Sequence, residues 1–246
     1  MLNFVHLYPY QLGLNGERGN LDCLQTRLKW AGVDSSRHEV SSEIDLPKSV
    51  DAVFIGSGTL SGALEALELM RPYQNKLREL AKDGVPILAL GLGWEILGQE
   101  VKLLDGSLVP GAGIFPSRST RVEKRASCEA FGFDNQGNLT AGYANHASDI
   151  ELLNGAKPLI ELASGYGNSS QVRAPEVSGE GLAFENLMAA RLNGPLLPLN
   201  PHLADAFLDL VAQRSGFEYK QDSDEAREVD QYSLNARTDL KKRLLS

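Results

Sequence analysis

A glycine-rich turn follows a hydrophobic run near the middle of the chain. Residues 85–90 are apolar, and residues 91–98 read Gly-Leu-Gly-Trp-Glu-Ile-Leu-Gly. This order predicts a buried strand, a sharp turn and a helix. α/β enzymes place a nucleophile on such turns because the strained backbone lifts one side chain clear of the sheet. Gly91 occupies that position, so the turn has the form needed for nucleophilic chemistry but lacks a side chain to attack.

A second glycine turn, residues 56–58, separates the apolar run 52–55 from helical sequence that starts near Ala63. A turn between a strand and a helix can hold a phosphate at the N-terminus of that helix. The spacing differs from the dinucleotide-binding pattern, and no phosphate-binding lysine follows. A plain tight turn and a ligand-binding turn both remain compatible with these residues.

The remaining nucleophile and base candidates are few. Cys23 lies in the middle of a predicted helix and Cys128 in a predicted irregular stretch, so both are interpreted as structural or incidental. His146, in Gly-Tyr-Ala-Asn-His at residues 142–146, is predicted to lie in a loop and to form hydrogen bonds rather than act as a base. Two cysteines give neither a disulfide framework nor metal-ligand spacing, and no cofactor or metal is predicted.

These candidates require a scaffold of alternating strands and helices. Apolar strands are predicted at 2–8, 52–55 and 85–90, and a first helix is predicted to be capped by Asn20 and closed by Gly32. This alternation predicts a doubly wound, mostly parallel α/β sheet. Residues 109–143 are interpreted as short strand-like pieces and turns. We expect one domain over residues 1–215 and a charged tail over 216–246, which forms a helix or an arm that docks onto a partner.

Charge and composition limit the classes of partner. The 246-residue chain has a formal net charge of −8, and 42% of its residues are hydrophobic. An acidic chain without a basic cluster does not favour nucleic acid as a partner. The first ten residues have no positively charged segment of a signal peptide, and no apolar run is long enough to span a membrane. We therefore expect no membrane insertion and a cytoplasmic location.

Several segments together resemble one enzyme family. The segments similar to its motifs are residues 7–9 (Leu-Tyr-Pro), 16–20 (Gly-Glu-Arg-Gly-Asn), 54–58 (Phe-Ile-Gly-Ser-Gly), 142–146 and 194–201 (Gly-Pro-Leu-Leu-Pro-Leu-Asn-Pro). The family is that of the glutaminase (GatD-like) subunits of lipid II isoglutaminyl synthase, within the cobyric-acid-synthase-like class I glutamine amidotransferases. The resemblance extends over the chain to about Arg214 and implies their flavodoxin-like fold.

The departures from the family fall in its active site. The family turn reads Cys-Gly-Gly-Tyr-Gln-Leu-Leu-Gly, and its cysteine attacks the glutamine amide, whereas this chain has Gly91. The family histidine lies in Tyr-Leu-His-Gly-Pro, and Asn193 takes its place here. The resemblance further implies substrate-binding positions at Gly56, Ser57, Gly58, Leu92 and Arg125, with the amides of Gly58 and Leu92 shaping an oxyanion pocket.

Covalent glutamine hydrolysis needs a thiolate and a base. The resemblance therefore implies a catalytically degenerate subunit of a complex that amidates the D-glutamate of a peptidoglycan precursor. Its expected partner in a heterodimer is a Mur-ligase-like, ATP-dependent ligase that uses free ammonia. Deliberate inactivation would also remove the two residues, but Thr59, Leu60, Trp94, Glu95 and Arg191 depart from the family as well, which favours natural divergence.

Two other interpretations remain open. In the first, the chain is a binding or regulatory module whose former glutamine pocket, formed by residues 56–60 with Trp94, Glu95 and Arg125, holds glutamine or another small ligand. In the second, the chain is an enzyme with displaced chemistry that uses Cys128 and His146.

Overall fold

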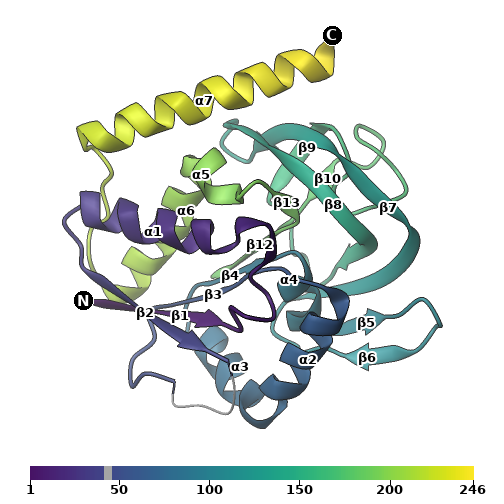
Figure 1. The fold of residues 1–246 in the computed structure, drawn as a ribbon. Coiled ribbons are helices and arrows are strands. Elements are labelled where there is room, and N and C mark those ends of the chain that lie inside the picture. Colours follow the sequence, from purple (N-terminus) through teal and green to yellow (C-terminus); the bar gives the residue numbers. More distant parts are fainter. Residues whose placement is uncertain (42–45) are drawn as a thin grey trace.

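The computed structural model describes residues 1–41 and 46–246 and contains two sheets (Figure 1). The first sheet has the order β11-β12-β4-β3-β1-β2 and is parallel except for β11, which pairs antiparallel with β12. Its strands are β1 (Leu2–Leu7), β2 (Ser35–Val40), β3 (Ala52–Ile55), β4 (Ile87–Leu90), β11 (Leu182–Phe184) and β12 (Leu187–Ala190). The doubly wound, mostly parallel α/β fold predicted from the sequence is confirmed.

Helices cover both faces of this sheet because its strands are apolar on both sides. In β4, Ile87 and Ala89 pack in one core cluster, and Leu88 and Leu90 pack in the other. The first cluster includes helices α2 (Leu60–Met70) and α3 (Gln74–Lys82), which are joined by a 3₁₀ turn, η2 (Arg71–Tyr73). The second includes α1 (Arg18–Trp30), which follows the turn η1 (Leu14–Gly16), and α5 (Leu196–Leu199) and α6 (Pro201–Ser215).

The structure corrects the predicted start of the first helix and agrees with its predicted end. The first helix begins at Arg18, so Asn20 lies inside its first turn instead of capping it. Asn20 accepts a hydrogen bond from the backbone of Leu197 at 2.8 Å and thereby links α1 to α5. Gly32 follows the helix with a φ of +74°, as expected for a residue that ends a helix in the left-handed conformation.

The second sheet corrects the prediction of short pieces between residues 109 and 143. It contains two long antiparallel strands, β7 (Ser117–Asp134) and β8 (Leu139–Leu152), which are joined by the predicted turn at residues 134–138. The other members are β5 (Glu100–Lys102), β6 (Leu108–Pro110), β9 (Ile160–Ser164), β10 (Gly179–Glu180) and β13 (Leu192–Asn193). The charged stretch at residues 121–125 and a register shift between Arg121 and Ala126 conceal the strand alternation in the sequence.

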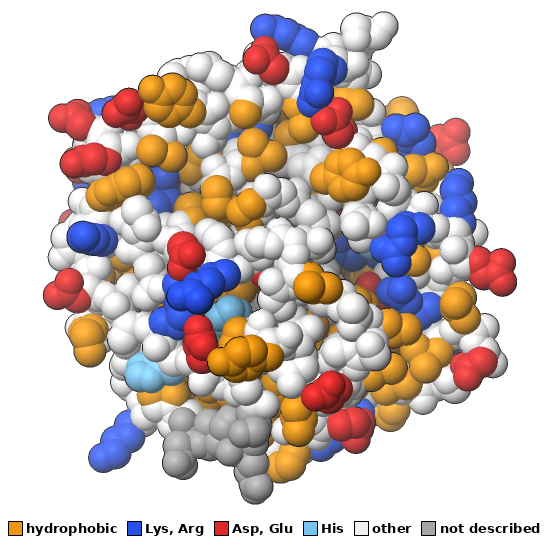
Figure 2. Space-filling view, in the orientation of Figure 1, with side chains coloured by type: hydrophobic (Ala, Val, Ile, Leu, Met, Phe, Trp, Pro, Cys, Tyr) orange, Lys and Arg blue, Asp and Glu red, His pale blue; other side chains and the backbone are white. Residues whose placement is uncertain are grey.

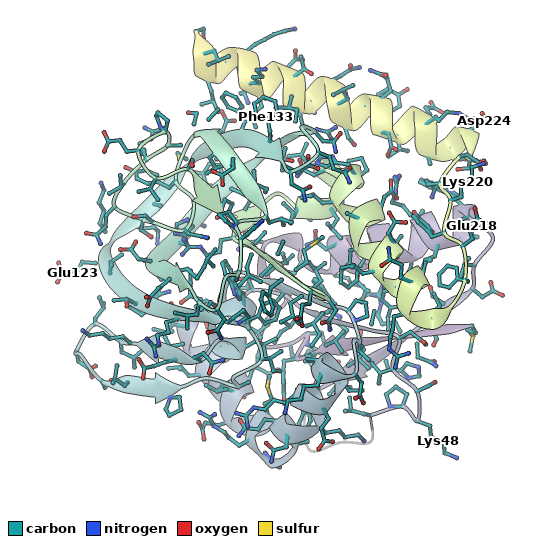
Figure 3. All side chains as sticks on the ribbon, turned by 180° about the vertical axis from the view of Figure 1, so that it is seen from behind. Lys48, Glu123, Phe133, Glu218, Lys220 and Asp224 are labelled. Atoms are coloured by element: carbon teal, nitrogen blue, oxygen red, sulfur yellow. The ribbon has the colours of Figure 1, made fainter. Side chains whose placement is uncertain are left out.

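The charged tail forms helix α7 (Asp224–Leu245), which lies against the rest of the chain. Figure 3 shows it crossing the second sheet above Phe133, and Lys241 Nζ lies 5.2 Å from the centre of that ring. At its other end, the buried Arg27 of α1 forms ion pairs with Asp205 of α6 at 2.6 Å and Asp230 of α7 at 2.7 Å. These contacts fix α7 on α1 and α6. Within the described residues, none of the helices has the length and hydropathy of a membrane span.

Candidate functional site

The site begins where β3 and β4 end, because neighbouring parallel strands bring their carboxyl ends to one edge of the sheet. The chain turns sharply at Gly91, where φ is +50° and ψ is −123°, and α4 (Leu92–Leu97) starts immediately afterwards. This is the strained strand–turn–helix geometry predicted from the glycine-rich sequence. The turn therefore keeps the backbone of a nucleophile site without a nucleophile.

The Ser57 side chain occupies the space beside Gly91. A β-carbon built on Gly91 would lie 2.3 Å from Ser57 Oγ and 2.7 Å from Ser57 Cβ, which is too close for any real side chain. The backbone N–H of Leu92 donates a hydrogen bond to Ser57 Oγ at 3.2 Å. The Ser57 side chain thus fills the space that a side chain on Gly91 would need. It also accepts the hydrogen bond of the Leu92 amide, which the family resemblance implies as part of an oxyanion pocket.

Most of the predicted site residues line one cavity of about 330 Å³, among them Ser57, Gly58, Gly91, Leu92, Arg125 and Asn193. Gly56 lies outside this lining, and a β-carbon there would come within 2.4 Å of the Leu12 carbonyl oxygen. Trp94 is also outside the cavity, because it is fully buried and its indole donates to Ser117 Oγ at 3.0 Å. The cavity therefore has Glu95, but not Trp94, in its wall.

Asn193 is held in place by its own amide. Its Nδ2 donates to the backbone carbonyls of Tyr143 and Arg191, each at 3.2 Å, and so ties β13 to β8. An amide nitrogen has no lone pair available to take up a proton near neutral pH. The residue at the family's histidine position thus serves here as a structural hydrogen-bond donor.

His146 lies inside strand β8 and is buried, so its predicted place in a loop is wrong. Ser170 Oγ uses its only hydrogen to donate to the Ser148 carbonyl at 2.6 Å. His146 Nδ1 lies 2.8 Å from the same hydroxyl, and its Nε2 has no hydrogen-bond partner in the described chain. Burial, with the nearby charges of Arg191 and Arg125, lowers the pKa of His146 to about 2.

His146 is consequently a weak base, because an efficient general base has a pKa near the working pH. Cys128 lies on β7, paired with Ala144, whereas His146 is paired with Ala126. No hydrogen bond joins Cys128 to the imidazole, since His146 Nε2 has no partner among the described atoms. Cys23 is no alternative nucleophile, because burial raises the pKa of its thiol to about 12. The geometry gives no support to displaced chemistry at these residues.

Glu95 lines the cavity, as the binding-module interpretation of the sequence expects, but its buried hydrogen-bond network has no sequence signal. Its carboxylate is 2% exposed and accepts hydrogen bonds from Ser119 Oγ and Ser148 Oγ, each at 2.6 Å. Arg121 Nη1 lies 3.4 Å from both of its oxygens. These donors come from β7 and β8, so Glu95 connects α4 to the second sheet.

Arg191 completes this buried network. Its Nη1 donates to the Ser148 carbonyl at 2.7 Å and to Ser148 Oγ at 3.0 Å, and its Nη2 donates to the Gly167 carbonyl. Ser148 therefore joins Arg191 to Glu95. Arg191 Nε has no partner within the described part of the chain, and burial lowers the pKa of the guanidinium. Departure from the family motif is the one sequence signal for Arg191, because the contacts of Arg191 come from distant strands.

Next to Gly56, burial raises the pKa of Glu17 to about 8, while a hydrogen bond from Asn20 at 3.1 Å opposes this shift. The carboxyl group stays protonated in the folded chain between pH 4.5 and 8 but ionises in the unfolded chain. Wild-type stability therefore falls as the pH rises through this window, by up to about 1.4 kcal/mol per pH unit.

Glu17→Gln removes this ionisation, so we expect its stability relative to wild type to rise from pH 4.5 to 8 and then level off. Urea unfolding at each pH measures the difference. Glu39→Gln, on an exposed position of β2, is the matched control. Equal pH profiles for Glu17→Gln and wild type would contradict the assignment of a protonated Glu17.

Comparisons with known proteins agree with this geometry. Residues 5–198 match the CobB/CobQ-like glutamine amidotransferase domain. The chain is 25% identical over 228 residues to the lipid II isoglutaminyl synthase (glutamine-hydrolyzing) subunit GatD of Staphylococcus aureus (strain N315), covering 92% of this chain and 91% of that protein.

Two solved structures share the fold. A glutamine amidotransferase crystal structure aligns with a TM-score of 0.59 and 18% identity, over 86% of this chain and 100% of that one. A glutamine amidotransferase from Thermotoga maritima aligns with a TM-score of 0.53 and 10% identity, over 98% and 94% of the two chains. The sequence match, which spans most of the chain, and the nucleophile turn without its nucleophile lead to the same assignment: this chain belongs to the CobB/CobQ-like glutamine amidotransferase family.

Proposed function

We propose that this chain is a non-catalytic glutaminase-type subunit that supports an ATP-dependent, Mur-ligase-like partner. Its similarity to a GatD subunit supports a role in amidating lipid II, the peptidoglycan precursor. The main support for a non-catalytic role is the position of the Ser57 side chain, which lies where a side chain on Gly91 would have to lie. In this proposal, the chain retains the fold and the docking surface, and free ammonia supplies the nitrogen.

The chemistry of the site argues against glutamine hydrolysis. Thioester formation needs a sulfur nucleophile, a base that takes its proton and N–H groups that stabilise the oxyanion. Gly91 supplies no sulfur, Asn193 supplies no base and the Leu92 amide is bonded to Ser57. A simple shortening of cysteine to glycine would leave a void, whereas here serine fills the space. This packing supports natural divergence over deliberate inactivation.

The experiment is co-purification from the native cell, followed by an amidation assay on the isolated complex. We expect a ligase of the Mur type at one-to-one stoichiometry, and amidated product from ammonium but not from glutamine. The ligase alone should amidate more slowly, or be less stable, than the ligase bound to this chain. If the complex used glutamine as fast as ammonium, the non-catalytic role would be wrong, and absence of such a ligase would remove the supporting role.

The second candidate function is a small-molecule binding module. The observation that favours it is the cavity itself, which keeps a volume of about 330 Å³ and a polar lining although the nucleophile position is filled. A pure scaffold would have no need to keep charged side chains there. Calorimetry with candidate ligands separates the two functions, because a scaffold should give no binding heat.

A further inference from the structure

Strand β2 lies at one end of the first sheet (Figure 1). It pairs with β1 on one side, and no strand of the described chain pairs with its other side. The backbone N–H of Tyr8 donates to the Val40 carbonyl at 2.6 Å, so Val40 and every second residue before it direct their backbone groups toward β1. The residues between them direct their backbone groups the other way. Arg37 and Glu39 therefore present N–H and C=O groups to an open edge.

The two residues on this edge carry opposite charges. Arg37 and Glu39 are two positions apart, so their side chains lie on the same face of the sheet. The Arg37 guanidinium pairs with Asp22 of α1, and Arg18 also approaches that carboxylate at 4.0 Å. Glu39 is exposed, and no lysine or arginine of the described chain forms an ion pair with it. The edge thus has surplus positive charge near Arg37 and a carboxylate without a partner on Glu39.

Antiparallel pairing of β2 with β2 of a second copy matches these charges in one register. When His38 lies opposite His38, Arg37 of each copy lies opposite Glu39 of the other, and these two residues exchange both backbone hydrogen bonds. The two neighbouring registers place Arg37 opposite Arg37 or Glu39 opposite Glu39, and like charges directly opposite each other are destabilising. Charges on an edge strand discourage pairing with other strands. Here they also select one register of the strand with itself.

We propose that two copies of this chain associate through antiparallel β2 strands and form one continuous sheet across a two-fold axis. The same residues then make the contact in both copies, as a closed dimer requires. On the left of the face shown in Figure 2, acidic and basic side chains lie next to each other in the region where Figure 1 draws α1 and β2. Mixed charge of this kind suits a self-complementary contact. Because each copy contributes one strand, we expect a weak, reversible dimer. The inference does not depend on the proposed function.

Sedimentation equilibrium of the full chain over a range of concentrations tests this inference. Glu39→Arg should weaken the dimer at least about tenfold, because both cross-strand pairs then contain like charges. Arg37→Glu should weaken it for the same reason, and its folding is verified by circular dichroism because the pair with Asp22 is lost. An equal mixture of the two variants restores opposite charges in both pairs, so we expect it to form a heterodimer about as tight as the wild-type dimer.

Glu123→Arg is the matched control, since it makes the same change of charge as Glu39→Arg. Glu123 lies exposed on β7 in the second sheet, and its replacement should leave the dimer unchanged (Figure 3). The proposal is overturned if the wild-type chain stays monomeric at the highest concentration, or if Glu39→Arg dimerises as tightly as wild type. It is equally overturned if the mixed variants associate no better than each alone, or if Glu123→Arg weakens the dimer as much as Glu39→Arg.

A disulfide cross-link tests the register and remains decisive if Arg37→Glu fails to fold. Opposite residues at a position without cross-strand hydrogen bonds have Cα atoms about 4.5 Å apart, which is within the range of a disulfide. Under mild oxidation, His38→Cys should therefore form a covalent dimer. Ser36→Cys, on the same face of the strand, should not, because Ser36 lies opposite Val40. Wild type controls for the native thiols. No cross-link at position 38, or equal cross-linking at 36 and 38, would reject the proposed pairing.

Discussion

Gly91→Cys will destabilise the chain by about 2–6 kcal/mol and will not create a glutaminase. The new β-carbon would lie 2.3 Å from Ser57 Oγ, and overpacking of this kind costs about 1–3 kcal/mol. The backbone at Gly91, with φ of +50°, adds a strain of about 1–3 kcal/mol for any residue with a side chain. Urea unfolding measures the sum. A variant as stable as wild type would show that Ser57 does not fill this space.

The double variant Gly91→Cys/Ser57→Gly should recover the overpacking part of that loss. We expect a favourable coupling of about 1–3 kcal/mol between the two sites in a double-mutant cycle. Gly137→Cys is the control for backbone strain alone, because Gly137 has a φ of +83° and open space around its β-carbon position. It should lose stability without any rescue by Ser57→Gly. Additive effects at Gly91 and Ser57 would contradict the inference that the Ser57 side chain fills the space needed by a side chain on Gly91.

Glu95→Ala is expected to cost about 3–5 kcal/mol of unfolding free energy. The substitution leaves Arg121 without its carboxylate and leaves the buried hydroxyls of Ser119 and Ser148 without their acceptor. Removing one partner from a buried charged network is costly because the remaining groups stay desolvated. Chemical unfolding measures the loss, and Glu151→Ala on an exposed position of β8 should change stability little. A loss below about 1 kcal/mol would show that this network does not hold α4 to the second sheet.

Local patterns account for the parts of the fold that could be predicted. The apolar strands β3 and β4 and the glycines that follow them form one continuous signal, so the turn at Gly91 and the neighbouring turn at Ser57 follow from sequence. The packing of the Ser57 side chain beside Gly91 does not follow from sequence, because it depends on the distance between two turn residues that are 34 positions apart. Only the three-dimensional structure places the Ser57 hydroxyl in the space beside Gly91.

The second sheet was harder to predict, since strand pairing is set by distant partners. Charged residues near Arg125 resemble a surface loop in the sequence, yet they lie within β7, and His146 lies within β8. The sequence indicates Glu95 as a pocket residue but not its hydrogen bonds, because the donors come from these two strands. The charged tail gave a weak helix pattern, and its attachment through Arg27 and Asp230 is likewise a long-range contact.

The most direct test is glutamine hydrolysis by the purified chain, alone and bound to the proposed ligase partner. Glutamine labelled with ¹⁵N in its side-chain amide allows release of ammonium and glutamate to be followed together. We expect no release above the rate in buffer for either sample, because no thiol lies at Gly91 and no base lies at Asn193. Catalytic turnover of glutamine by the wild-type chain, or a thioester trapped on either of its cysteines, would contradict the account.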